Sequence, residues 1–234
     1  LFVVSASNDQ TLRIWDLPGT RARTAIEGHT RDVRGCAFGP DGGFVVSASY
    51  DGTLKVWDTA TGDECATAGH TGAVQDCAVS PDGSFAVSVS SGSSGTLKIW
   101  DALTWQERVT LKVHSGWVNG CAISPDAAVI ISASSDDLKI WDASTGEERA
   151  TLACTRGAKD CAISPDGSFV VSATWGQTLE VWALPTAEKR VSLRAGEVNG
   201  CAISPDGSFV ISAGGERGHG VLKVWDVASW TADI

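Results

Sequence analysis

The chain has 234 residues, a formal net charge of −10 and a hydrophobic content of 43%. This balance is ordinary for a globular protein, and no apolar run approaches the roughly 18 residues that a membrane-spanning helix needs. The acidic surplus argues against nucleic acid and against an anionic membrane surface as partners, because both attract clusters of Lys and Arg. We therefore expect neither nucleic acid nor membrane as a partner.

The seven cysteines do not follow a disulfide or metal-binding pattern. Five of them occupy one repeated position, each followed by Ala and an apolar residue: Cys36, Cys77, Cys121, Cys161 and Cys201. No CxxC pair and no His–Cys cluster has the spacing of a zinc site. We expect structural free thiols, no metal and no cofactor. Free thiols favour a reducing compartment, so we expect a cytoplasmic location.

A short strand that ends in Trp recurs along the whole chain, usually followed by Asp. The intervals between the tryptophans are 41 to 43 residues. A fixed period in this range indicates a repeat architecture, in which each unit depends on its neighbours for its core. The six tryptophans are Trp15, Trp57, Trp100, Trp141, Trp182 and Trp225.

The first two repeats predict strands separated by polar turns. Leu1–Ser7 and Thr11–Trp15 form a predicted hairpin, and a third strand covers Arg21–Ile26, so the first repeat has no strand ahead of Leu1. The second repeat is complete, and Gly39-Pro40-Asp41-Gly42 is a clear turn in it. Its four predicted strands are Val33–Phe38, Phe44–Ser49, Leu54–Trp57 and Glu64–Ala68.

The later repeats follow the same order. The third spans Ala73–Lys112, the fourth Trp117–Ala153 and the fifth Ala158–Leu193. In the sixth, strands are predicted at Val198–Ser204, Ser208–Ala213 and Leu222–Trp225, and Ser229–Ile234 is too short to predict a fourth.

We expect residues 1–234 to form a single domain that is a segment of a longer chain, because no Met is present and both end repeats lack a strand. Propellers protect their sheet edges by closing into a ring. Upstream residues or another chain are therefore expected to complete the ring.

These repeats resemble the WD-repeat β-propeller family. The resemblance rests on Gly-His, Ser-Pro-Asp-Gly, Ser-Ala-Ser-x-Asp-Gly and Trp-Asp motifs, which recur in register over essentially the whole chain. It implies an all-β fold, a β-propeller of four-stranded antiparallel blades. Because the family is commonly seven-bladed, the six Trp-Asp repeats here are expected to be part of a seven-bladed ring. The near-identical repeats are similar to bacterial tandem arrays attached to signalling modules.

The resemblance also implies a hydrogen-bonded set in each blade: a His before the first strand, a Ser on the second, an Asp in the next turn and a Trp on the third. The second blade supplies His29, Ser47 (or Ser49), Asp51 and Trp57, and the fourth supplies His114, Ser132 (or Ser134), Asp136 and Trp141.

The third blade keeps the His, Ser and Trp but has no Asp in its turn, and the first keeps Ser5, Asp9 and Trp15. The fifth has Cys154 in place of His and Gly176 in place of Asp, and the sixth has Arg194 at the His position.

His, Ser and Asp together also raise the possibility of a hydrolase. A nucleophilic triad needs one Ser beside a His that an acid orients, with an oxyanion pocket. Here the set recurs from blade to blade and is tied to a strand Trp, as in a structural network. No nucleophile-elbow or P-loop motif is present. We therefore predict that the protein is not an enzyme.

The copies differ most in the turns between the second and third strands and in the loops that carry the His. We expect both to lie on one face, and variable loops on one face often mark a binding surface. Aromatic residues there break the repeat pattern, as in interaction hot spots, although each ring could instead pack on a neighbouring blade. The candidate partner-binding residues are Tyr50, Trp117, Trp175, Asn8, Arg31, Asp32, Ser135, Glu216 and Arg217.

The sequence thus predicts a non-catalytic platform, a scaffold or sensor module that binds a protein or peptide through this variable face. Two alternatives stay open. One is a propeller enzyme or small-molecule binder that uses the central channel, although the first strands offer few convergent polar groups. The other is a self-assembling structural module.

Overall fold

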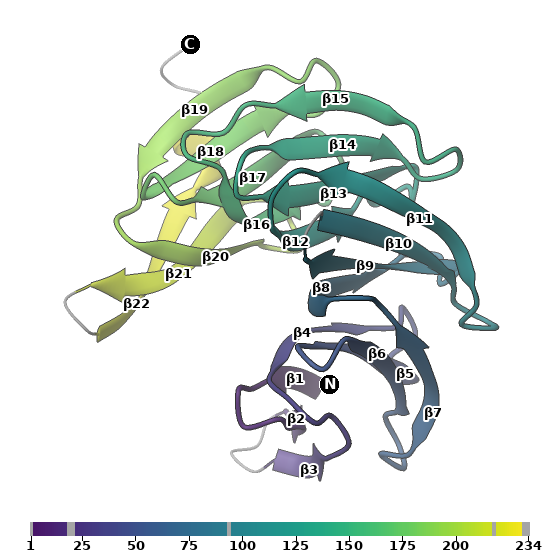
Figure 1. Cartoon of the computed structure of the whole chain (residues 1–234). Helices are drawn as coiled ribbons and strands as arrows, with labels where there is room; N and C mark the ends of the chain where they lie inside the picture. The colour runs from purple at the N-terminus through teal and green to yellow at the C-terminus, as the bar shows by residue number, and fades with distance from the viewer. Residues whose placement is uncertain (1, 18–21, 93–94, 217–218, 231–234) are drawn as a thin grey trace. The chain divides into compact units, whose positions relative to one another are not determined.

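The computed structural model describes residues 2–17, 22–92, 95–216 and 219–230. These residues form two compact units, the first ending at Val118 and the second beginning at Asn119. The described chain is almost entirely β, in six separate antiparallel sheets of three or four strands (Figure 1). Each sheet contains one Trp-Asp repeat, and we number these blades one to six in chain order. The prediction of an all-β fold of propeller blades is therefore confirmed.

The first unit contains blades one to three, and neighbouring strands in each sheet are consecutive in sequence. Blade one consists of β1 (Phe2–Ala6), β2 (Leu12–Asp16) and β3 (Ala22–Ile26); blade two of β4 (Val33–Phe38), β5 (Phe44–Ser49), β6 (Thr53–Asp58) and β7 (Glu64–Gly69); blade three of β8 (Ala73–Val79), β9 (Phe85–Ser91), β10 (Gly95–Asp101) and β11 (Glu107–His114).

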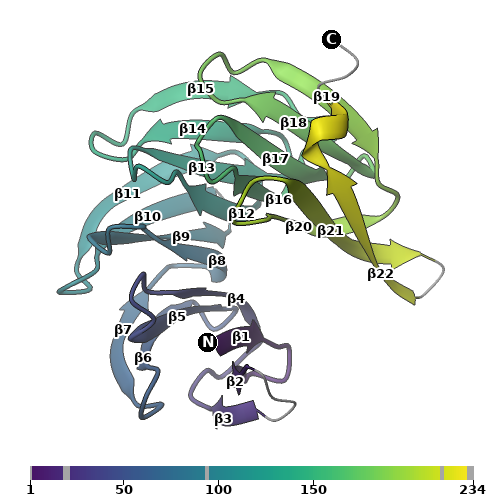
Figure 2. The same ribbon diagram turned by 180° about the vertical axis from the view of Figure 1, so that it is seen from behind.

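The second unit contains the rest of the chain, shown from behind in Figure 2. Blade four consists of β12 (Val118–Ile123), β13 (Val129–Ser134), β14 (Leu138–Asp142) and β15 (Glu148–Leu152); blade five of β16 (Ala158–Ile163), β17 (Phe169–Thr174), β18 (Thr178–Ala183) and β19 (Lys189–Arg194); blade six of β20 (Val198–Ile203), β21 (Phe209–Glu216) and β22 (His219–Asp226), followed by the 3₁₀ turn η1 (Val227–Trp230).

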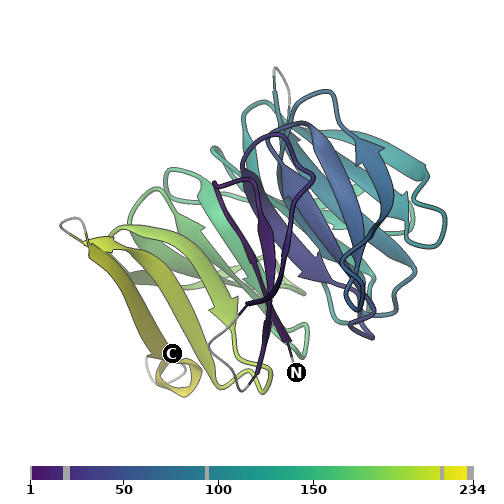
Figure 3. The same ribbon diagram turned by 90° about the horizontal axis from the view of Figure 1, so that it is seen from below.

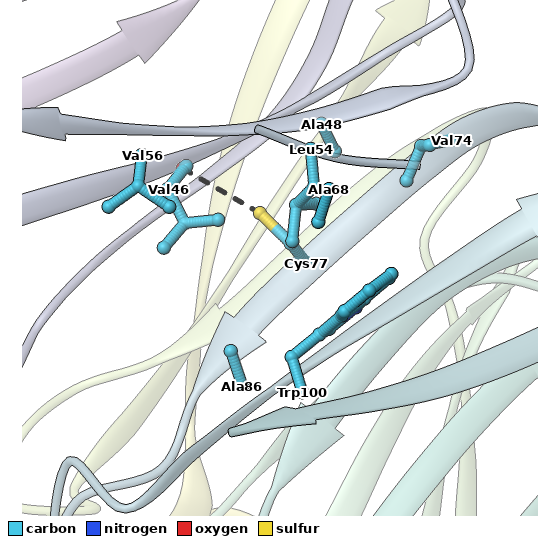
Figure 4. Packing of buried hydrophobic residues seen from close by; sticks show 9 residues of the cluster. All are labelled: Val46, Ala48, Leu54, Val56, Ala68, Val74, Cys77, Ala86 and Trp100. Atoms are coloured by element: carbon cyan, nitrogen blue, oxygen red, sulfur yellow. Dashed lines mark hydrogen bonds between the residues drawn. The ribbon is translucent and has the colours of Figure 1, made fainter. Parts of the chain in front are cut away.

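The second strand of each complete blade is the most buried. In β5 every residue after Phe44 is buried, and β17 is buried throughout, because both faces of these strands are covered by neighbouring sheets. In the first unit, side chains of blades two and three interlock around Trp100 (Figure 4). The Cys77 thiol lies in this cluster and donates to the carbonyl oxygen of Val46 at 3.7 Å. The apolar repeat positions thus form the contacts between successive blades.

Two shifts in strand register recur at fixed positions of the repeat and change the direction of particular side chains. A register shift directly precedes the Trp of the third strand in blades one to five. A second shift near the start of the first strand leaves one residue unpaired, and this residue is the one two before the repeated Cys. Such bulges turn a side chain out of the regular pleat. The four residues placed at this second bulge are Arg34, Gln75, Lys159 and Asn199.

Blade six differs from the prediction. The sequence predicts that its second strand ends at Ala213 and that its third begins at Leu222, with a loop between them. In the structure β21 and β22 continue into this loop and pair as far as Glu216 and His219. The prediction was wrong because an antiparallel ladder uses only backbone groups, which Gly supplies as well as any residue. After β22 the chain makes the single turn η1, seen at the end of the yellow strand in Figure 3. Within the described residues, blades one and six have three strands each.

Candidate functional site

In blade two a polar network joins the first, second and third strands. His29 precedes β4, and its Nδ1 lies 2.8 Å from Asp51 Oδ2 while its Nε2 lies 2.7 Å from Ser47 Oγ. Trp57 Nε1 donates to the same Ser47 Oγ at 2.8 Å. Thr53 donates to Asp51 through both its N–H and its hydroxyl. The structure thus brings His29, Ser47, Asp51 and Trp57 together, and it selects Ser47 over Ser49 as the serine of the set.

The protonation states in this network follow from its geometry. Burial raises the pKa of Asp51, but hydrogen bonds from Thr53, Thr30 and His29 outweigh that and lower it to about 2. Burial also lowers the pKa of His29, although Asp51 opposes this effect. Asp51 is therefore an ionised acceptor and His29 is neutral at pH 7. The Nδ1–H of His29 donates to Asp51, and its Nε2 accepts the Ser47 hydroxyl proton.

Blade three contains the same relay without the carboxylate. His70 Nε2 lies 2.5 Å from Ser88 Oγ, which also accepts from Trp100 Nε1 at 2.8 Å. The hydroxyl of Thr96 lies 3.4 Å from His70 Nδ1, as the hydroxyl of its counterpart Thr53 lies 3.2 Å from His29 Nδ1. Burial lowers the pKa of His70 to about 4, helped by the nearby Lys98. The carboxylate of Glu107 opposes this lowering only in part, so His70 also stays neutral at pH 7.

Part of this network is also seen in blades one, four and six. The bond from the Trp indole to the strand Ser is present in each of them: Trp15 to Ser5, Trp141 to Ser132 and Trp225 to Ser212, each at 2.9 Å. In blade four Ser132 rather than Ser134 accepts from Trp141. His114 is buried at the end of β11 in the first unit, and Asp136 is exposed after β13 in the second. The full set of blade four therefore remains a prediction.

Blade five replaces the network with a different one. Cys154 Sγ lies 3.8 Å from Ser172 Oγ, and among the described residues Trp182 Nε1 has no hydrogen-bond partner. Instead, the fully buried carboxylate of Glu180 accepts from the N–H of Thr155 at 3.2 and 3.3 Å and pairs with Lys189 at 3.0 Å. The loss of the His and the Asp is thus accompanied by an ion pair whose carboxylate is buried and whose Lys189 is partly exposed.

This ion pair reverses a pattern found in blades two to four. There a Lys on the third strand pairs with a Glu on the fourth, at 2.5 to 2.6 Å, and lies over the Trp ring at 5.2 to 5.8 Å. In blade five the acid is on the third strand and the base on the fourth, with Lys189 at 4.5 Å from the centre of the Trp182 ring. The sequence contains this signal, since Glu180 stands where sister repeats have Lys. Sequence reasoning missed it.

The His–Ser–Asp geometry of blade two has the distances of a catalytic triad, so its access to substrate decides its role. Ser47 has no exposed surface, and its oxygen is already engaged by Trp57 and His29. A nucleophile has to reach a substrate carbonyl beside an oxyanion pocket. The arrangement instead ties the turn that contains Asp51 to the body of the blade, as a satisfied buried network does.

The first unit contains several of the candidate binding residues on the loops beside this network. The backbone N–H of Tyr50 donates to the carbonyl of Asp32, and Arg31 donates to the carbonyl of Tyr50 at 3.4 Å. The Arg34 guanidinium lies over the Tyr50 ring at 5.0 Å and donates to Asn8 at 3.2 Å. Tyr50 is therefore half-buried under a cation, while Arg31 and Asn8 are exposed.

Trp117 lies at the end of the first unit, before β12. It is 63% exposed, so its ring is not packed into a blade. Its loop adjoins the turn of blade three, because a Cβ on Gly95 would meet the carbonyl of Gly116 and the side chain of Val118. This tryptophan therefore lies beside a turn between second and third strands, which is the kind of position that the sequence predicts for a binding surface.

In the second unit Trp175 is 52% exposed at the turn after β17. Lys159 lies over its ring at 4.4 Å and donates to Asn199 of blade six at 2.8 Å. The Trp175 N–H donates to the carbonyl of Gly157. Gly157 has φ +74° and touches the Ser135 backbone so closely that a side chain would not fit. Ser135 and Trp175 thus flank one loop. Arg156 also lies in this loop and is exposed, although it is not among the partner-binding residues predicted from the sequence.

Glu216 ends β21 and pairs with His219 through the backbone. Arg217 lies outside the described residues.

A further polar position was missed by sequence reasoning. The residue before the repeated Cys alternates between Gly and Asp, as Gly35, Asp76, Gly120, Asp160 and Gly200. Asp160 accepts from the N–H of Cys161 at 2.8 Å and from that of Cys201 at 2.9 Å, so it joins the first strands of blades five and six. Burial raises its pKa to about 6, against the effect of both hydrogen bonds.

The described residues contain neither a cluster of metal-binding side chains nor a membrane-spanning helix. No group of three or more His, Cys, Asp or Glu side chains lies close enough to hold a metal ion. No helix in this part of the chain is long and apolar enough to cross a membrane. All seven cysteines are free thiols.

Comparison with known proteins agrees with the architecture. Six segments match the family model of the WD domain, G-beta repeat: residues 1–16, 19–58, 63–101, 105–142, 146–183 and 189–226. These segments cover most of the chain and follow the blades, so the protein belongs to the WD-repeat family. A search of curated proteins found no match. Proteins of this family are typically scaffolds for protein interaction.

Proposed function

We propose that this chain is a non-catalytic platform that binds a protein or peptide through the loops on the His side of its blades. The observation that carries the proposal is the exposure of two large aromatic side chains there, Trp117 at 63% and Trp175 at 52%. Trp is enriched among the residues that dominate binding energy.

The surroundings of Trp175 support the same function. Lys159 is held over the ring at 4.4 Å by its bond to Asn199, so the aromatic face and the cation are both positioned before a partner arrives. Such preorganisation lowers the entropy that binding costs. Tyr50 with Arg34 repeats this arrangement in blade two at 5.0 Å. Attachment to a signalling module is part of the proposal by analogy alone.

The central-channel alternative has less support. Asp160 lies on the first strand of blade five and is an acidic group that a channel ligand could use. Both of its carboxylate oxygens, however, already accept backbone N–H groups. A small-molecule site needs convergent polar groups that are available to the ligand. A single domain over residues 1–234, and a seven-bladed ring that would need one blade more than the six repeats seen here, remain part of the proposal.

A pull-down with matched variants tests the proposed surface. The test variant is Tyr50→Ala, Trp117→Ala, Trp175→Ala. The control is Leu103→Ala, which truncates a side chain that is 91% exposed in the turn between the third and fourth strands of blade three. We expect the triple variant to lose the partners of the wild type and the control to keep them. Both should keep the wild-type unfolding temperature. Unchanged partners in the folded triple variant would reject the surface.

A further inference from the structure

A second, unrelated site is present in the second unit, at the end of the blades where the Ser-Pro-Asp turns lie. A pocket of about 590 Å³ opens between blades four and five. Its apolar floor comes from Val129, Ile140 and Ala150 of blade four and from Leu184 and Ala187 of blade five. Trp175 follows the C-terminal end of β17, whereas this pocket adjoins the turn before β17. The pocket is therefore separate from the proposed binding loops.

Two other pairs of blades have an indole ring at the corresponding place, whereas the pair of blades one and two has Gly62 there. In the first unit, Trp105 in the turn after the third strand of blade three packs edge-on against Phe44 of blade two, with ring centres 5.8 Å apart. In the second unit, Trp230 of blade six packs in the same way against Phe169 of blade five, at 6.3 Å. At each of these interfaces the chain fills the site with its own indole ring.

Between blades four and five both rings are missing. Ala187 occupies the position of Trp105 and Trp230, five residues after the repeated Trp, and Val129 occupies the position of Phe44 and Phe169. The corresponding pocket beside Trp230 measures about 340 Å³, smaller than the 590 Å³ found here. A further pocket of about 510 Å³ is also lined by Trp230, so the distinguishing feature between blades four and five is the pair of small side chains and not the volume alone.

The backbone of the turn is unchanged by this replacement. Ala187 has φ 58° and Trp105 has φ 56°, both in the left-handed region. The N–H of each donates to the carbonyl oxygen four residues earlier, at 2.8 and 2.7 Å. The Cβ of Ala187 therefore starts in the direction from which the indole of Trp105 extends. The pocket keeps the frame of an indole site without the indole.

The rim of the pocket is acidic. Asp126 and Asp166 both line it, and hydrogen bonds from Ser124 and Ser164 lower the pKa of the two carboxyls. Each uses Oδ1 for these bonds, and within the described residues no hydrogen bond reaches either Oδ2. The rim also contains Arg149, which pairs with Asp142 at 2.6 Å and whose charge helps to lower the pKa of Asp126, so of the two rim carboxylates only Asp166 is free of this cation's effect. The rim thus offers negative charge to a ligand.

We propose that this pocket binds a Trp side chain from a partner peptide in which Lys or Arg flanks the Trp. The indole takes the place that Trp105 and Trp230 occupy at the sister interfaces, and the flanking cations pair with Asp126 and Asp166. An anchor aromatic in a preformed pocket with complementary charge at the rim is a common form of peptide recognition.

Peptide titration followed by methyl NMR tests the chemistry of the occupant. The probe is acetyl-Lys-Trp-Lys-amide, with acetyl-Lys-Ala-Lys-amide and acetyl-Glu-Trp-Glu-amide for comparison. We expect the first to shift the methyl signals of Val129, Ile140 and Leu184 with a Kd of about 1 mM or below. The Ala peptide should cause no shifts, and the Glu peptide should bind at least about fivefold more weakly. Equal binding of the three peptides, or shifts confined to other residues, would overturn the proposal.

A variant that fills the pocket tests the location. Ala187→Trp restores the indole of the sister turns and should weaken the Lys-Trp-Lys peptide at least about tenfold while keeping or raising the unfolding temperature. Leu103→Trp adds an indole at an exposed turn position and should leave binding unchanged. If Ala187→Trp does not fold, Val129→Phe narrows the same pocket from the opposite wall and should give the same loss. Full binding by a folded filled variant would reject the site.

The two proposals fail separately. The variant Tyr50→Ala, Trp117→Ala, Trp175→Ala leaves the pocket residues intact, so it should bind the Lys-Trp-Lys peptide like the wild type. A loss of peptide binding in that folded variant would place the peptide on the His-side loops and overturn the pocket.

Discussion

Blades two and five fold the same repeat with opposite polar chemistry. In blade two, a neutral His29 links Asp51 to Ser47, which also accepts from Trp57, and Lys55 pairs with a Glu on the outer strand. In blade five the His and the Asp are absent and the Trp indole has no partner within the described residues. Its polar centre is Glu180, which is buried and paired with Lys189.

The difference shows that a blade can hold its loops with another set of polar residues, even where the indole N–H of Trp182 is buried without a partner among the described residues. Blade two distributes its hydrogen bonds over four side chains, and each buried group has a partner. Blade five has one ion pair with a buried carboxylate, and it holds the loop around Thr155 through Glu180 instead of through an Asp. A buried charge tolerates the loss of its partner poorly, because it is then left uncompensated. The two blades should therefore respond differently to substitution.

The largest expected effect is in the charge pair of blade five. Glu180→Lys places a cation at a fully buried position beside the partly exposed Lys189 and should lower the free energy of unfolding by about 3–5 kcal/mol. Lys189→Glu in the same chain recreates the order of charges found in blade two and should recover about half of that loss. In blade two, Glu64→Ala removes the exposed partner of Lys55 and should cost at most about 1 kcal/mol.

Urea unfolding of these variants measures the coupling between the two positions. If the double variant is no more stable than Glu180→Lys alone, the charges at positions 180 and 189 do not interact measurably. The ion pair would then be a packing feature and not an electrostatic replacement for the network of blade two.

The next effect separates the serines of the second strands. Ser47→Ala leaves His29 Nε2 and Trp57 Nε1 buried without partners, and each unsatisfied group costs about 1–3 kcal/mol. We expect a total loss of about 2–4 kcal/mol. Ser172→Ala, the same change in blade five, removes only contacts of 3.5 and 3.8 Å and should cost less than about 1 kcal/mol. Urea unfolding measures both, and equal losses would contradict the difference between the blades.

The repeat pattern predicted the elements well where apolar runs are bounded by strong turns. Val33–Phe38 and Phe44–Ser49 were predicted with the bounds that β4 and β5 have, because Pro, Asp and Gly end the first run and begin the turn. The extended β21–β22 hairpin was missed, because Gly carries no side-chain pattern that indicates pairing.

The candidate site was predictable only in part. The residues of the blade two network were named from the family resemblance, but the exposure of Trp175 and the half-burial of Tyr50 depend on which cation covers each ring. The charge reversal at Glu180 and the paired small residues Val129 and Ala187 are visible in the sequence. Their role can be recognised only from the fold, which brings Glu180 next to Lys189 and places Val129 and Ala187 in the lining of one pocket.

The smallest effect concerns the residue before the repeated Cys, which is Gly35 in blade two and Asp160 in blade five. Burial raises the pKa of Asp160 from about 4 to about 6, so between these pH values the folded state binds more protons than the unfolded state. Stability from this group is therefore present at low pH and is lost as the pH rises through 6. Asp160→Asn removes the titration, and from pH 4 to pH 8 the wild type should lose about 1–2 kcal/mol more than the variant.

Urea unfolding of both proteins at intervals between pH 4 and pH 8 measures this gap. The comparison of differences cancels the fixed cost of the Asn amide, which can accept only one of the two N–H groups that Asp160 accepts. The Cys201 thiol beside it stays neutral in this range, because burial and then the charge of Asp160 raise its pKa well above the ordinary value. If the wild type instead gains stability relative to the variant as the pH rises, the two backbone hydrogen bonds outweigh burial. Asp160 would then be a stabilising clasp between blades five and six that has no counterpart at Gly35.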